Sequence, residues 1–381
     1  MTENRSEGLV VDRLVKRYGA VTAVDDVSFA VAPGQFVSLL GPSGCGKTTT
    51  LRCIAGFERA DRGTISINSE IVTDAASNVF VPPNKRNFGM VFQSYAIWPH
   101  MTVLDNVGYP LRVQNRYPRG EIRERVLEKL ATVGLAGLED RFPTQLSGGQ
   151  QQRVAVARAL IMEPKVLLFD EPLSNLDAKL RERMRFELVE IQGKLGIPAV
   201  YVTHDQAEAM VMSSRVIVME GGHIAQEGPP EHIYAHPRSR FVADFIGLSN
   251  FVRAEVRDRS ANGAWLVQSA LGRHLCTGEG PHAKGDDVLL AIRPERIDLA
   301  REPFADGAGF AAELQSRYFL GPYSEYFLCV GEQTLRAQSS ASLPVAVGER
   351  LYARIEPEHC QIVGGGMDVA GQDQSERHDT G

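Results

Sequence analysis

Gly41-Pro-Ser-Gly-Cys-Gly-Lys-Thr48 matches the pattern G-x-x-x-x-G-K-[ST], in which glycines allow a loop to wrap around a phosphate. A short apolar run, Phe36–Leu40, precedes the loop and is typical of a buried strand. The segment after it, Lys47–Ala55, is typical of a helix. Backbone N–H groups of such a loop and the positive end of the helix both favour an anion. The stretch therefore predicts an α/β fold that binds a nucleotide.

The last two residues of the loop carry side chains with a direct chemical use. Lys47 can reach the β- and γ-phosphates of a nucleotide, and the Thr48 hydroxyl can bind Mg²⁺. ATP and Mg²⁺ are therefore the expected cofactors. By itself, the loop does not distinguish a transport ATPase from a kinase or a GTPase.

Two further apolar runs end in polar residues that suit the same chemistry. Val166–Phe169 is typical of a buried strand and leads into Asp170 and Glu171. Parallel strands present their C-terminal ends to the crevice where ligands bind. Asp170 is expected to hold the metal, and Glu171 to accept a proton from the attacking water. His204 follows the run Ala199–Thr203 and is expected to contact the γ-phosphate.

A second glycine-containing motif, Leu146-Ser-Gly-Gly-Gln150, stands directly before a predicted helix over Gln151–Met162. Ser147 lies near the expected N-cap, the two glycines permit close backbone approach, and the start of the helix is positive. The arrangement resembles a second phosphate cradle. Because one nucleotide needs only one cradle, the second is expected to serve the ATP of another copy of the chain.

With these motifs in this order, the chain resembles the nucleotide-binding subunit of ABC transporters over nearly its whole length. The resemblance implies an α/β P-loop NTPase with a RecA-like core and a helical subdomain. It implies catalytic roles for Glu171, His204 and Lys47, and metal binding by Thr48, Gln93 and Asp170. The implied nucleotide contacts are Tyr18, Gly41, Pro42, Ser43, Gly44, Cys45, Gly46, Lys47, Thr48, Thr49, Gln93, Ser147, Gly148, Gly149, Gln150 and Asp177.

Several of these implied roles belong to a dimer. In the family, two copies join head to tail, so that Ser147–Gly149 of one copy closes on the γ-phosphate held by Lys47 of the other. Gln93 matches the glutamine that senses the metal and the γ-phosphate, and Tyr18 falls where an aromatic ring stacks on adenine. Ser174–Asp177 matches the loop that links the two sites. ATP binding is then expected to close the dimer, and hydrolysis to release it.

The pattern of the sequence changes near residue 250. From there, short β-rich runs alternate with turns, which predicts a small all-β barrel or sandwich. The runs are Phe251–Val256, Ala264–Val267, Asp287–Ile292, Glu325–Val330 and Arg350–Ile355. Together with the resemblance, this pattern implies an ABC ATPase domain over residues 9–240, an OB-like, TOBE-type domain over residues 241–365, and a disordered tail over residues 366–381.

Composition limits the partners. The 381 residues carry a formal net charge of −6, so no overall basic field favours nucleic acid, and none is expected as a partner. No apolar run approaches the 18 residues of a membrane span. Five scattered cysteines fit reduced thiols better than a disulfide framework. The expected location is the cytoplasmic face of the inner membrane, as a peripheral subunit.

One motif in the β-rich part resembles a subgroup of the family. Ala291-Ile-Arg-Pro-Glu295 is similar to the core of the accessory domain of importer ATPases, which implies uptake. The implied partners are integral membrane permease subunits and, indirectly, a substrate-binding protein. Gln93–His100 is similar to iron(III), polyamine and phosphonate relatives. An ATPase of a sugar, thiamine or sulfate importer, and a soluble ABC ATPase that acts on DNA or ribosomes, remain alternatives.

Two smaller features leave alternatives open. Tyr95, Trp98 and Met101 either line a cleft that receives a permease helix or belong to the core. Cys45, inside the phosphate loop, is either inert or redox-sensitive through a lowered thiol pKa.

Overall fold

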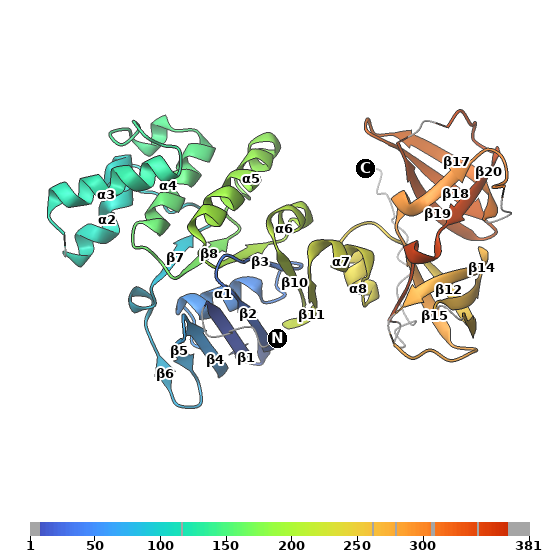
Figure 1. The fold of residues 1–381 in the computed structure, drawn as a ribbon, viewed down its shortest axis with the longest axis horizontal. Coiled ribbons are helices and arrows are strands. Elements are labelled where there is room, and N and C mark those ends of the chain that lie inside the picture. The colour runs from blue at the N-terminus through green and yellow to red at the C-terminus, as the bar shows by residue number, and fades with distance from the viewer. Residues whose placement is uncertain are drawn as a thin grey trace, which may run out of the picture. The chain divides into compact units, whose positions relative to one another are not determined.

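The computed structural model describes residues 8–115, 117–260, 263–278, 280–305, 309–340 and 343–364. By its internal contacts the chain forms two compact units, Met1–Glu231 and His232–Gly381 (Figure 1). The predicted disordered tail, residues 366–381, lies outside the described residues.

A six-stranded sheet forms the centre of the first unit (Figure 1). Five of its strands are parallel neighbours, and the edge strand β11 pairs antiparallel with β10. Their runs of apolar residues are buried on both faces, as is typical of parallel sheets. In spatial order the strands are β11 (His223–Gly228), β10 (Arg215–Glu220), β3 (Phe36–Leu40), β9 (Ala199–Thr203), β8 (Val166–Asp170) and β7 (Phe88–Val91).

A second, antiparallel sheet of five strands shares its core with helix α1 (Lys47–Ala55) and one face of the parallel sheet. Its order is β2 (Val21–Val31), β1 (Leu9–Tyr18), β4 (Arg62–Ile67), β5 (Glu70–Asp74) and β6 (Val79–Phe80). Two further helices, α5 (Ala178–Leu195) and α6 (Gln206–Met212), follow β8 and β9 in the chain. The predicted order of strand, loop and helix at residues 36–55 is confirmed.

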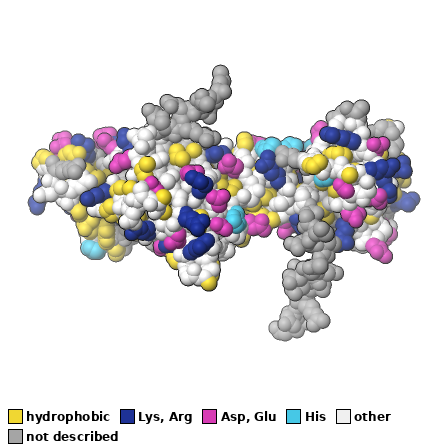
Figure 2. Space-filling view, turned by 90° about the horizontal axis from the view of Figure 1, so that it is seen from below, with side chains coloured by type: hydrophobic (Ala, Val, Ile, Leu, Met, Phe, Trp, Pro, Cys, Tyr) yellow, Lys and Arg dark blue, Asp and Glu magenta, His cyan; other side chains and the backbone are white. Residues whose placement is uncertain are grey.

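Three helices form the predicted helical subdomain (Figure 1): α2 (Val103–Gln114), α3 (Arg119–Thr132) and α4 (Gly148–Leu160), which contact one another. Helix α4 begins earlier than the predicted Gln151, because Ser147 caps it and brings both glycines into its first turn. Tyr109 and Val113 of α2 are exposed. In Figure 2, hydrophobic side chains gather over this end of the unit.

The second unit is built from strands, as the sequence predicts. A closed barrel of five strands contains β12 (Asn250–Arg259), β13 (Trp265–Ser269), β14 (Gly272–Gly278), β21 (Cys360–Val363) and β15 (Asp287–Ile292), a strand number typical of OB folds. A separate five-stranded sheet contains β16 (Ile297–Ala300), β20 (Arg350–Ile355), β17 (Phe310–Phe319), β18 (Ser324–Val330) and β19 (Gln333–Ser339). One apolar core joins the barrel and the sheet.

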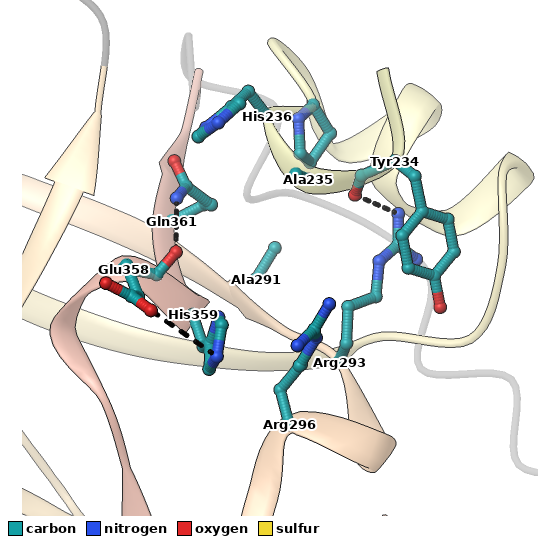
Figure 3. Close-up of a pocket in the computed structure, with 10 residues that line it drawn as sticks. Tyr234, Ala235, His236, Ala291, Arg293, Arg296, Glu358, His359 and Gln361 are labelled. Carbon is teal, nitrogen blue, oxygen red and sulfur yellow. Dashed lines mark hydrogen bonds and ion pairs between the residues drawn. The ribbon is translucent and has the colours of Figure 1, made fainter. Parts of the chain in front are cut away.

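Arg293, the central residue of the Ala291–Glu295 motif, attaches two short helices to the barrel. Its guanidinium donates to the backbone oxygens of Ala243 at 2.7 Å, Gly247 at 2.9 Å and Tyr234 at 3.2 Å. Figure 3 shows the last of these bonds at the side of a hollow. Helices α7 (Pro230–Ala235) and α8 (Arg240–Phe245) are thereby attached to the barrel, so the predicted boundary after residue 240 lies inside the second unit.

Candidate nucleotide site

The phosphate loop connects the end of β3 to α1, and two of its glycines have no room for a side chain. Gly46 has φ +103°, and a Cβ there would lie 2.4 Å from the Ala23 carbonyl oxygen. A Cβ at Gly41 would lie 2.4 Å from the Met219 carbonyl oxygen. Pro42, Ser43 and Gly44 form the exposed outer part of the loop. Backbone packing therefore fixes the two ends of the loop and leaves its middle open to solvent.

Lys47 lies inside this loop and is only 5% exposed. Its ammonium donates to the carbonyl oxygens of Gly41 at 2.7 Å and Pro42 at 2.8 Å. Within the described residues, no carboxylate forms an ion pair with it. A buried ammonium with neutral partners strongly attracts an anion, and a phosphate group suits this position.

Thr48 and Asp170 bring two oxygen donors together at the end of the sheet. The Thr48 hydroxyl donates to Asp170 Oδ1 at 3.3 Å, from α1 to the end of β8. Burial raises the pKa of Asp170, and the Thr48 hydrogen bond and the charge of Arg52 oppose part of the shift. A hydroxyl and a carboxylate are ligands that Mg²⁺ prefers. The residues present fit a magnesium ion, and a cation there would offset the cost of the buried carboxylate charge.

Glu171 and His204 meet beside this pair. Glu171 Oε2 lies 3.1 Å from His204 Nδ1. Parallel pairing of β8 with β9 places the two strand ends side by side, and the Glu171 N–H donates to the Val202 carbonyl oxygen at 3.0 Å. Glu171 has φ +46°, a left-handed conformation that is costly for a residue with a side chain. Such strain is typical of functional sites, where the surrounding structure enforces it.

His204 is followed by a supported turn. Asp205 forms an ion pair with Arg185 at 3.1 Å. It is also the N-cap of α6, where its carboxylate accepts a hydrogen bond from the Glu208 N–H at 3.0 Å. The Thr203 hydroxyl donates to Glu208 Oε2 at 2.7 Å. The backbone on the C-terminal side of His204 is therefore fixed, while its imidazole is mostly exposed.

Gln93 follows β7 closely, and its side chain is exposed. Its backbone oxygen accepts from Asn175 Nδ2 at 2.8 Å. Asn175 belongs to the predicted loop Ser174–Asp177, and Asp177 ends this loop as the N-cap of α5, where it accepts from the Leu180 N–H at 3.0 Å. The structure thus joins the predicted glutamine loop to the predicted cross-site loop.

The second cradle opens α4. Ser147 and Gln150 form a capping box, in which the Gln150 N–H donates to Ser147 Oγ at 3.4 Å and the Ser147 N–H donates to Gln150 Oε1 at 2.9 Å. Gly148 and Gly149 pack against α5 and against Leu176, which precedes that helix. A Cβ on Gly149 would lie 2.9 Å from Leu180 Cδ1. Among the described residues, no hydrogen bond joins this cradle to the phosphate loop. Within one chain, the two cradles are separate.

Three remaining predicted residues are located as follows. Tyr18, at the end of β1, is 45% exposed, and Lys16 Nζ lies 4.9 Å from its ring centroid. Cys45 is buried in the loop, 3.7 Å from Lys47 Nζ. Thr49 is half-buried in the first turn of α1.

Two residues near the site, Arg158 and Asn175, were not predicted as site residues. Arg158 of α4 donates to the backbone oxygens of Tyr95 and Ala96, close to Gln93. Asn175 holds the Gln93 oxygen. Both act on backbone atoms far away in the sequence. Arg158 lies in the helix predicted over Gln151–Met162, and Asn175 lies in the loop Ser174–Asp177, but nothing in the local sequence of either residue indicates its distant partner.

Comparison with known families gives two matches along the chain. The family model described as ABC transporter matches residues 24–174, and the TOBE domain model matches residues 290–363. The Fe(3+) ions import ATP-binding protein FbpC 1 of Rhizobium meliloti is 49% identical over 335 residues, which cover 88% of this chain and 91% of that protein. The spermidine/putrescine import ATP-binding protein PotA of Acidothermus cellulolyticus is 43% identical over 368 residues, 94% of each.

Solved structures agree with this assignment. The dimeric structure of a bacterial ABC transporter cassette is 33% identical, with a TM-score of 0.50, and covers 58% of this chain and 98% of that one. The structure of cbiO1 from Clostridium perfringens, part of the cbiONQ ABC transporter complex, is 29% identical, with a TM-score of 0.55. The match covers 63% of this chain and 94% of that one.

The chain therefore belongs to the ATP-binding subunits of ABC transporters. Within that family it is an import-type subunit, with an ATPase cassette followed by a C-terminal TOBE domain, and it hydrolyses ATP. A kinase and a GTPase, which the phosphate loop alone left open, are excluded. In the part of the chain that the structure describes, no helix is both long and apolar enough to cross a membrane.

Proposed function

We propose that two copies of this chain close head to tail over two ATP molecules and drive iron(III) uptake through membrane permease subunits. The observation that carries the proposal is the meeting of Lys47, Thr48–Asp170 and Glu171–His204 at one end of the parallel sheet. Phosphoryl transfer depends on positioning and on stabilising charge, and this set supplies a cation, two oxygen ligands and a base.

Each part of the set has a separate role. Lys47 moves its ammonium from the loop carbonyls to the β- and γ-phosphate oxygens, whose negative charge is the stronger partner. Thr48 and Asp170 would hold Mg²⁺, and Gln93, two residues after β7, would be a further ligand. When bound, the ion neutralises charge that develops on the phosphate oxygens.

Glu171 is the proposed base. Its carboxylate accepts the proton of the attacking water, and His204 holds one carboxylate oxygen at 3.1 Å and contacts the γ-phosphate with its other ring nitrogen. The two neighbouring carboxylates have different partners, since Asp170 accepts from the Thr48 hydroxyl and Glu171 lies against His204. The Asp170 and Glu171 side chains therefore serve different tasks although they are neighbours in sequence.

The second cradle requires a second chain. Ser147 is exposed at the positive start of α4, and in the described residues it shares no hydrogen bond with the phosphate loop of its own chain. Such a cradle suits the γ-phosphate held by another copy. Tyr18 stacks on adenine, and Asp177 faces the partner from the start of α5. The dimeric state of the related bacterial cassette supports this arrangement.

The helical subdomain suits a permease contact. Trp98 is partly buried, and Tyr109 and Val113 are exposed on α2 at the end where Figure 2 shows hydrophobic side chains together. Contiguous apolar surface of this kind marks an interaction site. A permease bound there holds the subunit at the cytoplasmic face of the membrane, and a substrate-binding protein on the other side delivers the cargo.

Iron(III) is the proposed cargo because it is the cargo named for several of the similar relatives, at 47–49% identity. A polyamine is the second candidate, since the PotA relative matches over a longer part of the chain. Uptake of radiolabelled iron(III) and of putrescine should be compared in cells that carry the wild-type gene, a deletion, or Glu171→Gln. Iron uptake should be lost in the deletion and in Glu171→Gln, with putrescine uptake unchanged. Loss of putrescine uptake alone would make the polyamine the cargo, and retention of both would refute the transport proposal.

A further inference from the structure

The loop after Gln93 has a costly backbone conformation. Tyr95 has φ +60° and Ala96 has φ +49°, both in the left-handed region although neither is glycine. The Tyr95 side chain is buried, and its hydroxyl has no hydrogen-bond partner among the described residues. Burial raises the pKa of this hydroxyl. Contacts elsewhere must therefore hold the loop in place.

Arg158, in the last turn of α4, provides one such contact. Its Nη1 donates to the Ala96 oxygen at 2.5 Å, and its Nη2 donates to the Tyr95 oxygen at 2.6 Å. Its guanidinium also lies 5.0 Å from the ring centroid of Trp98, which in turn lies 4.7 Å from that of Tyr109. Burial lowers the pKa of Arg158, but a guanidinium stays protonated at neutral pH. One side chain thus binds both left-handed residues.

Asn175 provides the second contact. It holds the Gln93 oxygen from the loop that follows Glu171. The segment Gln93–Ala96 is therefore tied on one side to the neighbourhood of the proposed base. On the other side it is tied to α4, whose opposite end, about 16 Å away, carries Ser147.

We propose that Arg158 is a positioning residue that makes the orientation of α4, and so of Ser147–Gln150, follow the conformation of the Gln93 loop. The inference rests on the proposed roles of Gln93 and of the second cradle. When Gln93 engages a bound nucleotide, the oxygens of Tyr95 and Ala96 move with it. Because Arg158 binds both oxygens with two parallel bonds, α4 moves as a body with the loop. Nucleotide held by one cradle thereby sets the position of the other cradle.

A merely structural Arg158 would stabilise the helical subdomain without transmitting anything. Arg153 offers a matched control on the same helix. It donates to the Val133 oxygen at 3.4 Å and pairs with Glu187 at 3.8 Å, so it too holds a backbone carbonyl, but not in the Gln93 loop. Arg158→Met removes the bonds to the loop, Arg158→Lys keeps a charge with a single donor group, and Arg153→Met removes a comparable arginine elsewhere.

The experiment measures amide hydrogen exchange in the full chain, with and without ATP and Mg²⁺, at residues 93–98 and at the first turn of α4. In the wild type and in Arg153→Met, ATP should slow exchange in both segments. In Arg158→Met, ATP should slow exchange in the loop alone. The KM for ATP should change by less than about twofold and kcat should fall by about tenfold, with Arg158→Lys in between.

The possible results distinguish a failure of the proposed role of Arg158 from a failure of the proposed nucleotide site. If both segments still respond together in a folded Arg158→Met, Arg158 transmits nothing and the inference is wrong. If Arg158→Met does not fold, the same comparison in Arg158→Lys decides, since a full response of α4 there refutes the inference. If wild-type exchange does not respond to ATP at all, the proposed nucleotide site itself fails, and the inference fails with it.

Discussion

Glu171 Oε2 lies 3.1 Å from His204 Nδ1, although 33 positions of sequence separate the two residues. The contact exists because β8 and β9 are parallel neighbours, and Glu171 and His204 are the residues that directly follow them.

Glu171→Gln should bind ATP, dimerise stably with it and hydrolyse it about 10²–10⁴-fold more slowly, because an amide accepts no proton from water. Glu190→Gln is the matched control: Glu190 is exposed on α5 and pairs only with Lys194 among the described residues, at 2.7 Å. Single-turnover ATPase and sedimentation with ATP are the measurements. A monomer with ATP, or a normal rate, would contradict the assignment of Glu171.

His204→Ala should lower kcat by about 10²-fold while ATP binding is retained, because the carboxylate of Glu171 loses its orienting contact and the phosphate loses a hydrogen bond. His223→Ala should leave kcat unchanged, since His223 is an exposed histidine of β11 whose carboxylate partner is Asp25, 3.6 Å away. Steady-state kinetics of both variants test the difference. Equal effects would mean that His204 has no special role.

Asp170→Asn should abolish magnesium-dependent ATPase yet raise the melting temperature of the nucleotide-free chain at neutral pH. Burial raises the pKa of Asp170, so the charged form costs stability in the folded state above that pKa. Below the ordinary Asp pKa of about 3.9, the group is neutral in both states and the cost disappears. The gain from the substitution should therefore be full at pH 7 and shrink as the pH falls through the raised pKa.

Thermal unfolding of wild type and Asp170→Asn across this pH range is the measurement, made without magnesium or nucleotide. Asp177→Asn is a suitable control, because an exposed N-cap is replaced by another good N-cap residue. A destabilising effect of Asp170→Asn at pH 7 would show that the carboxylate is favourably paired instead.

Arg293→Met should destabilise the second unit by about 2–4 kcal/mol, because the buried oxygen of Ala243 and the partly buried oxygens of Gly247 and Tyr234 lose their donor. Arg296, three residues later, is exposed, and Arg296→Met should change the stability by less than about 0.5 kcal/mol. Trp265 lies in the barrel core and the other tryptophan, Trp98, lies in the first unit, so in a Trp98→Phe background the fluorescence follows unfolding of the second unit in denaturant. Equal stability of the two variants would show that the Arg293 bonds are not needed.

Local patterns were sufficient to select many of the residues that the structure brings together at the candidate site, although their roles stay predictions. The phosphate loop, the two carboxylates after β8 and the cap before α4 each occupy a few consecutive residues, and their chemistry depends on that local order. Strand order, the second sheet of the C-terminal unit and the contacts of Arg158 and Asn175 depend on chain segments far apart. A lone arginine in a helix looks like a solvated residue until its carbonyl partners are known.

Glycine adopts the left-handed backbone of residue 171 without the cost that glutamate incurs there. A chain with Glu171→Gly is therefore expected to be inactive and yet more resistant to heat than one with Glu171→Gln, whose side chain keeps the strain. Selection for durability alone would remove the acid from this position. High thermal stability is therefore a poor criterion for selecting active variants of this subunit, because the most heat-resistant variants include ones that no longer hydrolyse ATP.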